Sequence, residues 1–570
     1  MVLSAAQQPD STYRVWKRFT FPDEKGRIDA ISVPKRVGDT LNPAYALIVD
    51  LALVNFWSVF FGVILYVYMR RHASKEDKLK PLAPKLWNKR SDLISLVIEA
   101  FTSMGQKCPS PLTVLLLFLC LAGWVGQKAA GILVPPLILI DGAAPVDPAA
   151  IYAPDRSNLD SLGVSNLFAL EVPRFLRALG GTAAGDEIRK KVKISQATLL
   201  GQTSDGDNIQ RIDYGYSATG ADMGLQRFPD LTLKVSGSCV TEYGWYNGTV
   251  NLTDNFDRVT SVDGYNVWGN KTDPIFTVSL YDGRQPSATF FPGTSSSQGT
   301  LPTSNATWAA VVSSIGRVSF SPSTDPWYLT NPVSASEGGT GAQYAVVGRR
   351  PPLSCWQDDV WSYQDHNSTV EELNKIPGLD LSDDLQAILS SILGIPMIQL
   401  VGIYLKTSAL LSSTTANDQI FDASASSIHG DLERLVQTAY VATINSLTDL
   451  TLYPAGARLS NLARDESNQP RDGIGEFVVW SPDVAALSTV AIIVIPSVFL
   501  GLGILSVILL NWTPVQDVNK LESDGTSAKI TQKPSSANRP GTEPVTTPTE
   551  EKQSYTGSQA PAALDVGNKV

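Results

Sequence analysis

The sequence predicts an integral membrane protein with three transmembrane helices and a large α+β ectodomain between the second and third helices. Three observations favour this fold class: three long apolar segments, one strongly basic loop, and five glycosylation sequons gathered in one region. A length of 570 residues leaves room for more than one folded unit. The net charge of −10 argues against a nucleic-acid partner, because such proteins normally carry a basic face.

The apolar segments lie at 44–69, 112–132 and 484–511. Each supplies the ~20 mostly apolar residues that a helix needs to cross a bilayer. Residues 1–43 contain no apolar signal-peptide segment, so we expect an N-terminal tail and insertion started by the first helix.

A fourth apolar stretch, 388–405, has no charged residue but is interrupted by Pro396 and Gln399. We expect a buried ectodomain helix there. The alternative is a fourth span, which would move the C-terminal tail to the outside.

Charge and sequons orient the three spans. Loop 70–111 contains eight Lys or Arg in its first twenty-one residues, which marks it as cytoplasmic. Within it, 91–107 is amphipathic and either lies on the inner leaflet or packs against the spans. Sequons are modified only on the lumenal or extracellular side. The usable ones all follow the second span: Asn247, Asn251, Asn270, Asn305 and Asn367.

These signals place the N-terminus and the ectodomain, 133–483, outside. The tail, 512–570, is rich in Ser, Thr and Pro and poor in apolar residues, so we expect it to be disordered and cytoplasmic. The sequon at Asn511 would then be inside and unmodified. The lipid bilayer is the first partner, at the plasma membrane or in another secretory-pathway membrane.

Inside the ectodomain, periodicity changes along the chain. A short helix is expected near 167–179, closed by Gly180 and Gly181. From about 187 to 321, short alternating segments separated by Gly, Asn, Asp and Pro are typical of antiparallel strands. From about 381 onward the pattern is helical, so we expect a β-rich part followed by a helical part.

Two residue pairs are candidates for structural roles. Cys239 and Cys355 are the only cysteines of the sequon-bearing region, and an oxidising compartment favours a disulfide between them; the alternative is two buried thiols. Asp50 and Lys128 fall in the first two spans at similar depth near the outer interface. They either form a salt bridge or reach separately to the headgroups.

No catalytic constellation is found. The chain lacks H-E-x-x-H, a G-x-S-x-G elbow, a phosphate loop and a dinucleotide fingerprint, so no metal, cofactor or catalytic residue is predicted. His366 and His429 are the histidines of the ectodomain. Asp205 and Asp207 form a D-x-D that fits a solvated turn better than a metal site. Asp358-Asp359 either recognises a ligand or belongs to a packed tryptophan corner.

Several segments resemble a stretch of uncharacterised multi-span membrane glycoproteins of filamentous ascomycete fungi. They are Cys355-Trp356, the Trp361-Ser362-Tyr363 cluster, IPGLDL at 376–381, FDASASSI at 421–428 and LERLVQTAYVAT at 432–443. The resemblance brings no activity. It implies an accessory role in secondary-metabolite biosynthesis or export, because some such proteins are encoded beside those genes.

The primary expectation is therefore a membrane glycoprotein whose ectodomain binds, senses or has a structural role, without enzymatic activity. Its partner would be an extracellular or lumenal ligand or protein. The accessory role in a secondary-metabolite pathway is the alternative.

Overall fold

The computed structural model describes most of the chain between Thr12 and Leu510. The described residues are 12–23, 26–71, 95, 98, 111–134, 137–153, 161–182, 185–253, 259–269, 276–279, 287–293, 306–334, 341–417, 419–453, 459–462, 471 and 473–510. Nearly all of the basic loop with its amphipathic stretch, and all of the C-terminal tail with Asn511, lie outside them. The predictions for those segments stay predictions.

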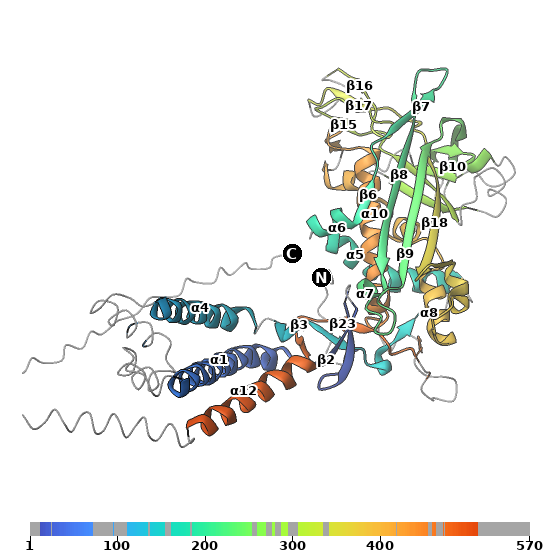
Figure 1. Ribbon diagram of the computed structural model, residues 1–570. Helices are drawn as coiled ribbons and strands as arrows, with labels where there is room; N and C mark the ends of the chain where they lie inside the picture. The colour runs from blue at the N-terminus through green and yellow to red at the C-terminus, as the bar shows by residue number, and fades with distance from the viewer. Residues whose placement is uncertain are drawn as a thin grey trace, which may run out of the picture.

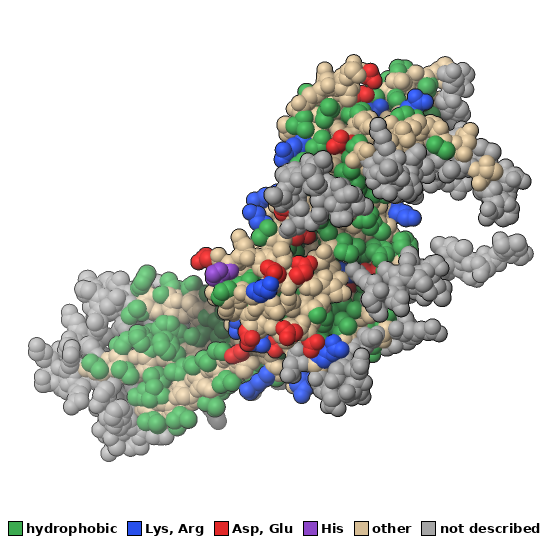
Figure 2. Space-filling model, turned by 90° about the vertical axis from the view of Figure 1, so that its right-hand side faces the viewer, with side chains coloured by type: hydrophobic (Ala, Val, Ile, Leu, Met, Phe, Trp, Pro, Cys, Tyr) green, Lys and Arg blue, Asp and Glu red, His purple; other side chains and the backbone are tan. Residues whose placement is uncertain are grey.

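Three long helices run side by side away from a large, mostly β domain (Figure 1). They are α1 (Lys35–Arg71), α4 (Pro111–Leu133) and α12 (Thr489–Leu510). Among the described residues, two helical segments are long and apolar enough to cross a membrane, Lys35–Ile64 and Thr489–Leu509. The described side chains of this arm are apolar on the face seen in Figure 2, whereas charged side chains gather on the domain.

A four-stranded sheet, which we call the junction sheet, connects the helices to the domain. Its strands, in spatial order, are β1 (Arg18–Asp23), β2 (Gly26–Pro34), β24 (Val484–Ser488) and β3 (Leu139–Asp141). All neighbouring strands are antiparallel. The sheet therefore joins the N-terminal segment to residues more than 450 positions later in the chain.

The junction sheet corrects two boundaries. The predicted N-terminal tail instead forms a hairpin, in which Phe19 and Phe21 are buried, and α1 begins at Lys35. The third apolar segment begins as strand β24, and its helix starts only at Thr489. Residues 484–487 are buried on both faces of the sheet, so they form a continuous apolar run that hydropathy alone does not distinguish from a helix.

The domain is built on one large sheet. It has eight strands in the described part of the chain, with β13, β14, β18, β9, β8 and β6 side by side and with β19 and β7 pairing onto β18 and β8. Its bounds are β6 (Val192–Ile194), β7 (Thr198–Gln202), β8 (Asn208–Thr219), β9 (Thr232–Thr241), β13 (Ser287–Pro292), β14 (Ala306–Ser313), β18 (Leu353–Tyr363) and β19 (His366–Ser368).

Helices cover one face of the large sheet, which we call the inner face (Figure 1). Alternate residues such as Tyr214, Tyr216 and Trp308 point into a core shared with these helices. The helices of the domain are α5 (Ser161–Gly181), α6 (Asp186–Lys191), α7 (Gly220–Met223), α8 (Asp383–Leu393), α9 (Met397–Leu405), α10 (Ile428–Ile444) and α11 (Ser446–Asp449).

Local sequence explains where helices α10 and α8 begin. Ser427 caps α10 by accepting a hydrogen bond from the backbone N–H of Gly430, and Ser382 caps α8 in the same way through Leu385. The stretch 388–405 lies in α8 and α9, which are separated by Gly394–Pro396 and bent by 52°. Most of their side chains lie in the main core, so the stretch packs inside the domain, as expected.

The opposite, outer face of the large sheet is only partly covered. A three-stranded sheet packs over β13 and β14 through Phe291, Ala309 and Val311; its strands are β10 (Tyr246–Thr253), β11 (Val259–Tyr265) and β12 (Phe276–Ser279). The remaining strands are short: β15 (Val318–Ser319), β16 (Thr330–Pro332), β17 (Tyr344–Val346), β20 (Ala416–Asn417) and β21 (Ile420–Phe421) in one sheet, β22 (Ser460–Asn461) with β5 (Tyr152–Ala153), and β23 (Val478–Trp480) with β4 (Ala143–Pro145).

Candidate functional site

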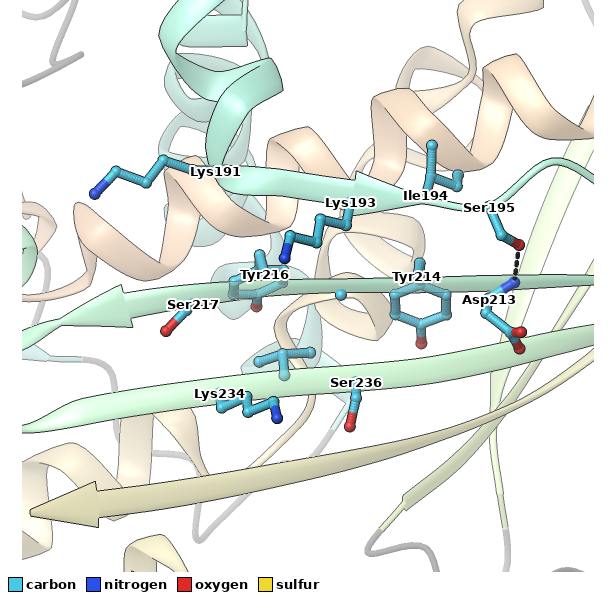
Figure 3. Close-up of a pocket in the computed structure, with 12 residues that line it drawn as sticks. Lys191, Lys193, Ile194, Ser195, Asp213, Tyr214, Tyr216, Ser217, Lys234 and Ser236 are labelled. Carbon is cyan, nitrogen blue, oxygen red and sulfur yellow. Dashed lines mark hydrogen bonds between the residues drawn. The ribbon is translucent and has the colours of Figure 1, made fainter. Parts of the chain in front are cut away.

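The candidate site is a depression on the outer face of the large sheet, over β6, β8 and β9 (Figure 3). Its volume is about 620 Å³, within the range of small-molecule sites. The residues that line it are Lys191, Lys193, Ile194, Ser195, Asp213, Tyr214, Gly215, Tyr216, Ser217, Lys234, Val235 and Ser236.

Strand register explains the depression. Gly215 of β8 lies opposite Lys193 of β6 on one side and opposite Ser236 of β9 on the other. Successive residues of a strand face opposite sides of the sheet, so Asp213 and Ser217 share the outer face with Gly215. The glycine has no side chain, and the floor at this point is therefore the backbone of β8.

The same register gathers lysines around that floor. Ser217 lies opposite Lys234, while Lys191 ends α6 directly before the strand that carries Lys193. Figure 3 shows Lys191 and Lys193 on one side of β8, and Lys234 and Ser236 on the other. All three lysines are exposed. Ser195 also borders the depression, and its hydroxyl accepts a hydrogen bond from the backbone N–H of Asp213 at 2.8 Å.

The one carboxylate of the lining is already neutralised. Arg211 donates from Nε to Asp213 at 2.8 Å and to Ser238 at 2.9 Å, and its guanidinium lies 5.6 Å from the centre of the Trp356 ring. Partial burial pushes the pKa of Asp213 upward, but hydrogen bonds with Ser238 and Arg211 and the charge of Arg211 outweigh it and lower the pKa. Asp213 thus stays ionised and paired, which leaves a positive field over the depression.

None of these residues stands out in the sequence as a candidate for a site. Lys193, Gly215 and Lys234 are separated by about twenty positions each in the chain and meet only because β6, β8 and β9 pair. The alternation of charged and apolar residues predicts strands, but it does not say which strands are neighbours. Hydropathy and spacing therefore could not predict that these three residues share one face of the sheet.

The predicted structural pairs come together in the structure. Cys239 on β9 and Cys355 on β18 lie opposite each other and form a disulfide between adjacent strands. Lys128 Nζ lies 3.5 Å from Asp50 Oδ1, and the neighbouring Gln127 Nε2 donates to the same oxygen at 2.9 Å. The pair therefore connects α4 to α1.

Three of the five sequon asparagines are described, and all three are exposed: Asn247, Asn251 and Asn367. They lie on β10 and β19, which are outside the lining of the depression. Asn270 and Asn305 fall outside the described residues. Sugar on the three exposed asparagines would be compatible with the fold.

The weaker candidates for chemistry do not converge. Asp205 and Asp207 lie in the β7–β8 turn, where Gly206 has a φ of +88°. Asp358 and Asp359 are consecutive on β18 and so face opposite sides of the sheet. His366 is on β19 and His429 in the first turn of α10. Among the described residues, no group of three His, Cys, Asp or Glu side chains is placed to hold a metal ion.

Two buried polar clusters belong to the core. Arg174 lies 3.3 Å from both Glu171 and Asp449, and it holds α5 against α11. At the start of α10, Asp431 is fully buried and accepts hydrogen bonds from the Tyr328 hydroxyl at 2.5 Å and from the Ser412 backbone N–H at 2.8 Å. Burial outweighs these hydrogen bonds and raises the pKa of Asp431 to about 7.

A family model described as a domain of unknown function, DUF8406, matches residues 172–479. The chain belongs to the DUF8406 family. The matched region runs from within α5 to β23 and contains the depression, the disulfide and α10. It leaves out α1, α4, α12 and the junction sheet. No characterised protein and no solved structure matches the chain.

Proposed function

We propose that this DUF8406 chain is a three-span membrane glycoprotein whose central domain lies on the non-cytosolic side and binds a ligand there. The observation that carries the topology is the junction sheet. Strand β2 leads directly into α1 and β24 directly into α12, while the chain that leaves α4 enters β3. Since these strands are neighbours, the three helices meet the domain at one end of the helical arm (Figure 1).

This sheet makes α4 the candidate for the third span. If α1 crosses the bilayer, the chain has to cross back before Leu139, because β3 and β2 belong to the same sheet. Between α1 and β3, α4 is the one long helix that the structure describes. Its 23 residues would reach about 35 Å at 1.5 Å per residue, which is sufficient for the hydrocarbon core.

The packing of α4 supports this role. It runs along α1, where Gly123 allows the Trp57 ring to approach so closely that a Cβ would lie 2.9 Å from it. Its other faces expose apolar side chains such as Phe118, Leu121 and Val125. Exposed side chains of this kind are what lipid solvates.

Orientation follows from charge and sequons. Arg70 and Arg71 end α1 at the end of the arm opposite the junction sheet, and basic residues continue beyond them. Positive residues favour the cytosolic side. The exposed sequons lie on the domain, at the other end of the arm. Both signals support a non-cytosolic domain in a secretory-pathway membrane.

Binding is proposed in preference to catalysis. Among the described residues, the depression contains no histidine or cysteine, and its single carboxylate is paired with Arg211. A depression lined by lysine side chains and serine hydroxyls suits recognition of a ligand. An extracellular or lumenal ligand is therefore the partner that the site favours.

Glycosylation mapping tests the topology. In the full chain expressed in a eukaryotic host, Asn247→Gln, Asn251→Gln and Asn367→Gln should each increase mobility relative to the parent, and endoglycosidase should remove the differences. Asn511→Gln is the matched control and should change nothing. A reporter sequon in loop 72–110 should stay unmodified. Sugar at Asn511 or in that loop, or a domain without sugar, would refute the topology.

A further inference from the structure

We propose that the lysine-lined depression on the outer face binds a small organic anion with about two negative charges and an apolar body. Phosphate monoesters and dicarboxylates are the two forms of this chemistry. The inference rests on the proposed binding role and names its ligand class, but it does not depend on which side of the membrane the domain faces.

The first support is the uncovered part of the sheet. The three-stranded sheet packs over β13 and β14, and helices pack on the inner face, whereas the outer face over β6, β8 and β9 forms the open depression. The space in the middle of this row is empty because a side chain does not fit there: a Cβ on Gly215 would lie 2.7 Å from the carbonyl oxygen of Val235. Gly215 keeps it open between Lys193 and Ser236, whose backbones lie about 10 Å apart across two strand spacings.

The second support is the charge. Three lysines and one aspartate line the cavity, and Arg211, outside the lining, neutralises that aspartate. Lys191 has Asp222 at 4.0 Å, at the limit of an ion pair. Within the described part of the chain, Lys193 and Lys234 form no salt bridge. Like charges held on one face repel each other, and an anion between them would relieve that repulsion.

The third support is the chemistry of the walls. Lysine is a compact point charge that binds phosphate and carboxylate groups. The hydroxyls of Ser217 and Ser236 lie on the same face and donate hydrogen bonds to anionic oxygens. The aliphatic stems of the lysines provide apolar surface for the body of the ligand, whereas the side chains of Ile194 and Val235 pack into the main core on the inner face.

The test uses the full-length protein in phosphatidylcholine nanodiscs and isothermal titration at low salt, with empty nanodiscs as reference. Phenyl phosphate and phthalate are the probes, and benzyl alcohol is the neutral comparator. We expect saturable one-to-one binding of at least one anionic probe and none of benzyl alcohol. The stronger of the two anions identifies the ligand class. Absence of saturable binding by both anions would overturn the proposal.

Variants locate the binding. Lys193→Gln combined with Lys234→Gln should weaken the affinity by about tenfold or more, since two charges near the anion are removed. Arg189→Gln combined with Lys190→Gln removes the same two charges directly before Lys191, from side chains outside the lining, and should change the affinity less than about twofold. Equal losses in the two variants would mean general electrostatic attraction and would overturn the assignment.

Folding is controlled separately. Both lysines are exposed and repel each other, so the melting temperature without ligand should be unchanged or slightly higher in the double variant. Lys193→Arg with Lys234→Arg keeps the charges and should retain binding. The result is also independent of topology, because a protein with a cytosolic domain would fail the sugar mapping and still bind the probe in nanodiscs.

Discussion

The junction sheet and the large sheet differ in how their strands meet solvent. In the junction sheet, β24 is buried on both faces, with Ala486 packed on one side and Ala485 and Leu487 on the other. In the large sheet, β8 buries Tyr214 and Tyr216 on the inner face and exposes Asp213 on the outer face. The first arrangement connects helices to a domain, and the second leaves a surface on which recognition can take place.

The difference also explains which strands can be recognised from the hydropathy pattern of the sequence. A strand covered on both faces needs apolar residues at every position, as in VAAL at 484–487, and then merges with the apolar helix that follows. A strand covered on one face alternates and is recognised as a strand. Strand β24 of the junction sheet was not predicted for this reason, whereas the β-rich nature of the domain was predicted.

The largest predicted effect breaks the junction sheet. Ala486→Asp would bury an unpaired carboxylate opposite Asp141 in a strand without solvent access. We expect a loss of about 4 kcal/mol or more, enough to prevent folding of the sheet. The measurement is the yield of protease-resistant, monodisperse protein after solubilisation.

Thr198→Asp is the matched control, because Thr198 is an exposed residue of β7 in the large sheet. It should cost less than about 1 kcal/mol and leave the yield unchanged. If both variants fold equally well, β24 is not buried on both faces, and the two sheets do not differ in this respect.

Other parts of the fold were predictable because their signals are local. The helix near 167–179 ends at a glycine pair, and α10 follows a serine cap and a repeating apolar face. The N-terminal hairpin was not predicted, although it carries a local signal, since Phe19 and Phe21 alternate with Arg18 and Thr20. The depression around Gly215 could not be predicted, because it depends on the pairing of strands.

The second prediction is a pH dependence of stability. It comes from Asp431 of α10, on the inner face of the large sheet that the helices cover. The pKa of Asp431 is raised in the folded state, so the native protein holds a proton that the unfolded chain releases. The contribution of Asp431 to stability is therefore greatest below the ordinary pKa of about 4 and is lost as the pH rises through about 7. We expect a loss on the order of 2 kcal/mol between pH 5 and pH 8, seen as a lower melting temperature.

Asp431→Asn removes the titration while keeping a hydrogen-bonding side chain at this position. It should reduce the pH dependence of the melting temperature without abolishing it, because burial also raises the pKa of Asp325 and of Asp359 to about 6. A variant with the parent's slope would assign the effect to another group. A slope of the opposite sign in the parent would mean that the hydrogen bonds from Tyr328 and Ser412 outweigh burial.

The smallest predicted effect lies in the helical arm, in the contact between Asp50 and Lys128. The two side chains are 37% and 57% exposed, so their attraction should contribute no more than about 1 kcal/mol. Asp50→Lys and Lys128→Asp should each lower the melting temperature slightly, and the double exchange should recover part of the loss. Full recovery is not expected, because Gln127 also donates to Asp50 and would lose that acceptor. A double variant whose loss equals the sum of the two single losses would show that each side chain interacts with headgroups independently. In that case α4 would be held to α1 by packing such as that of Gly123 against Trp57 alone.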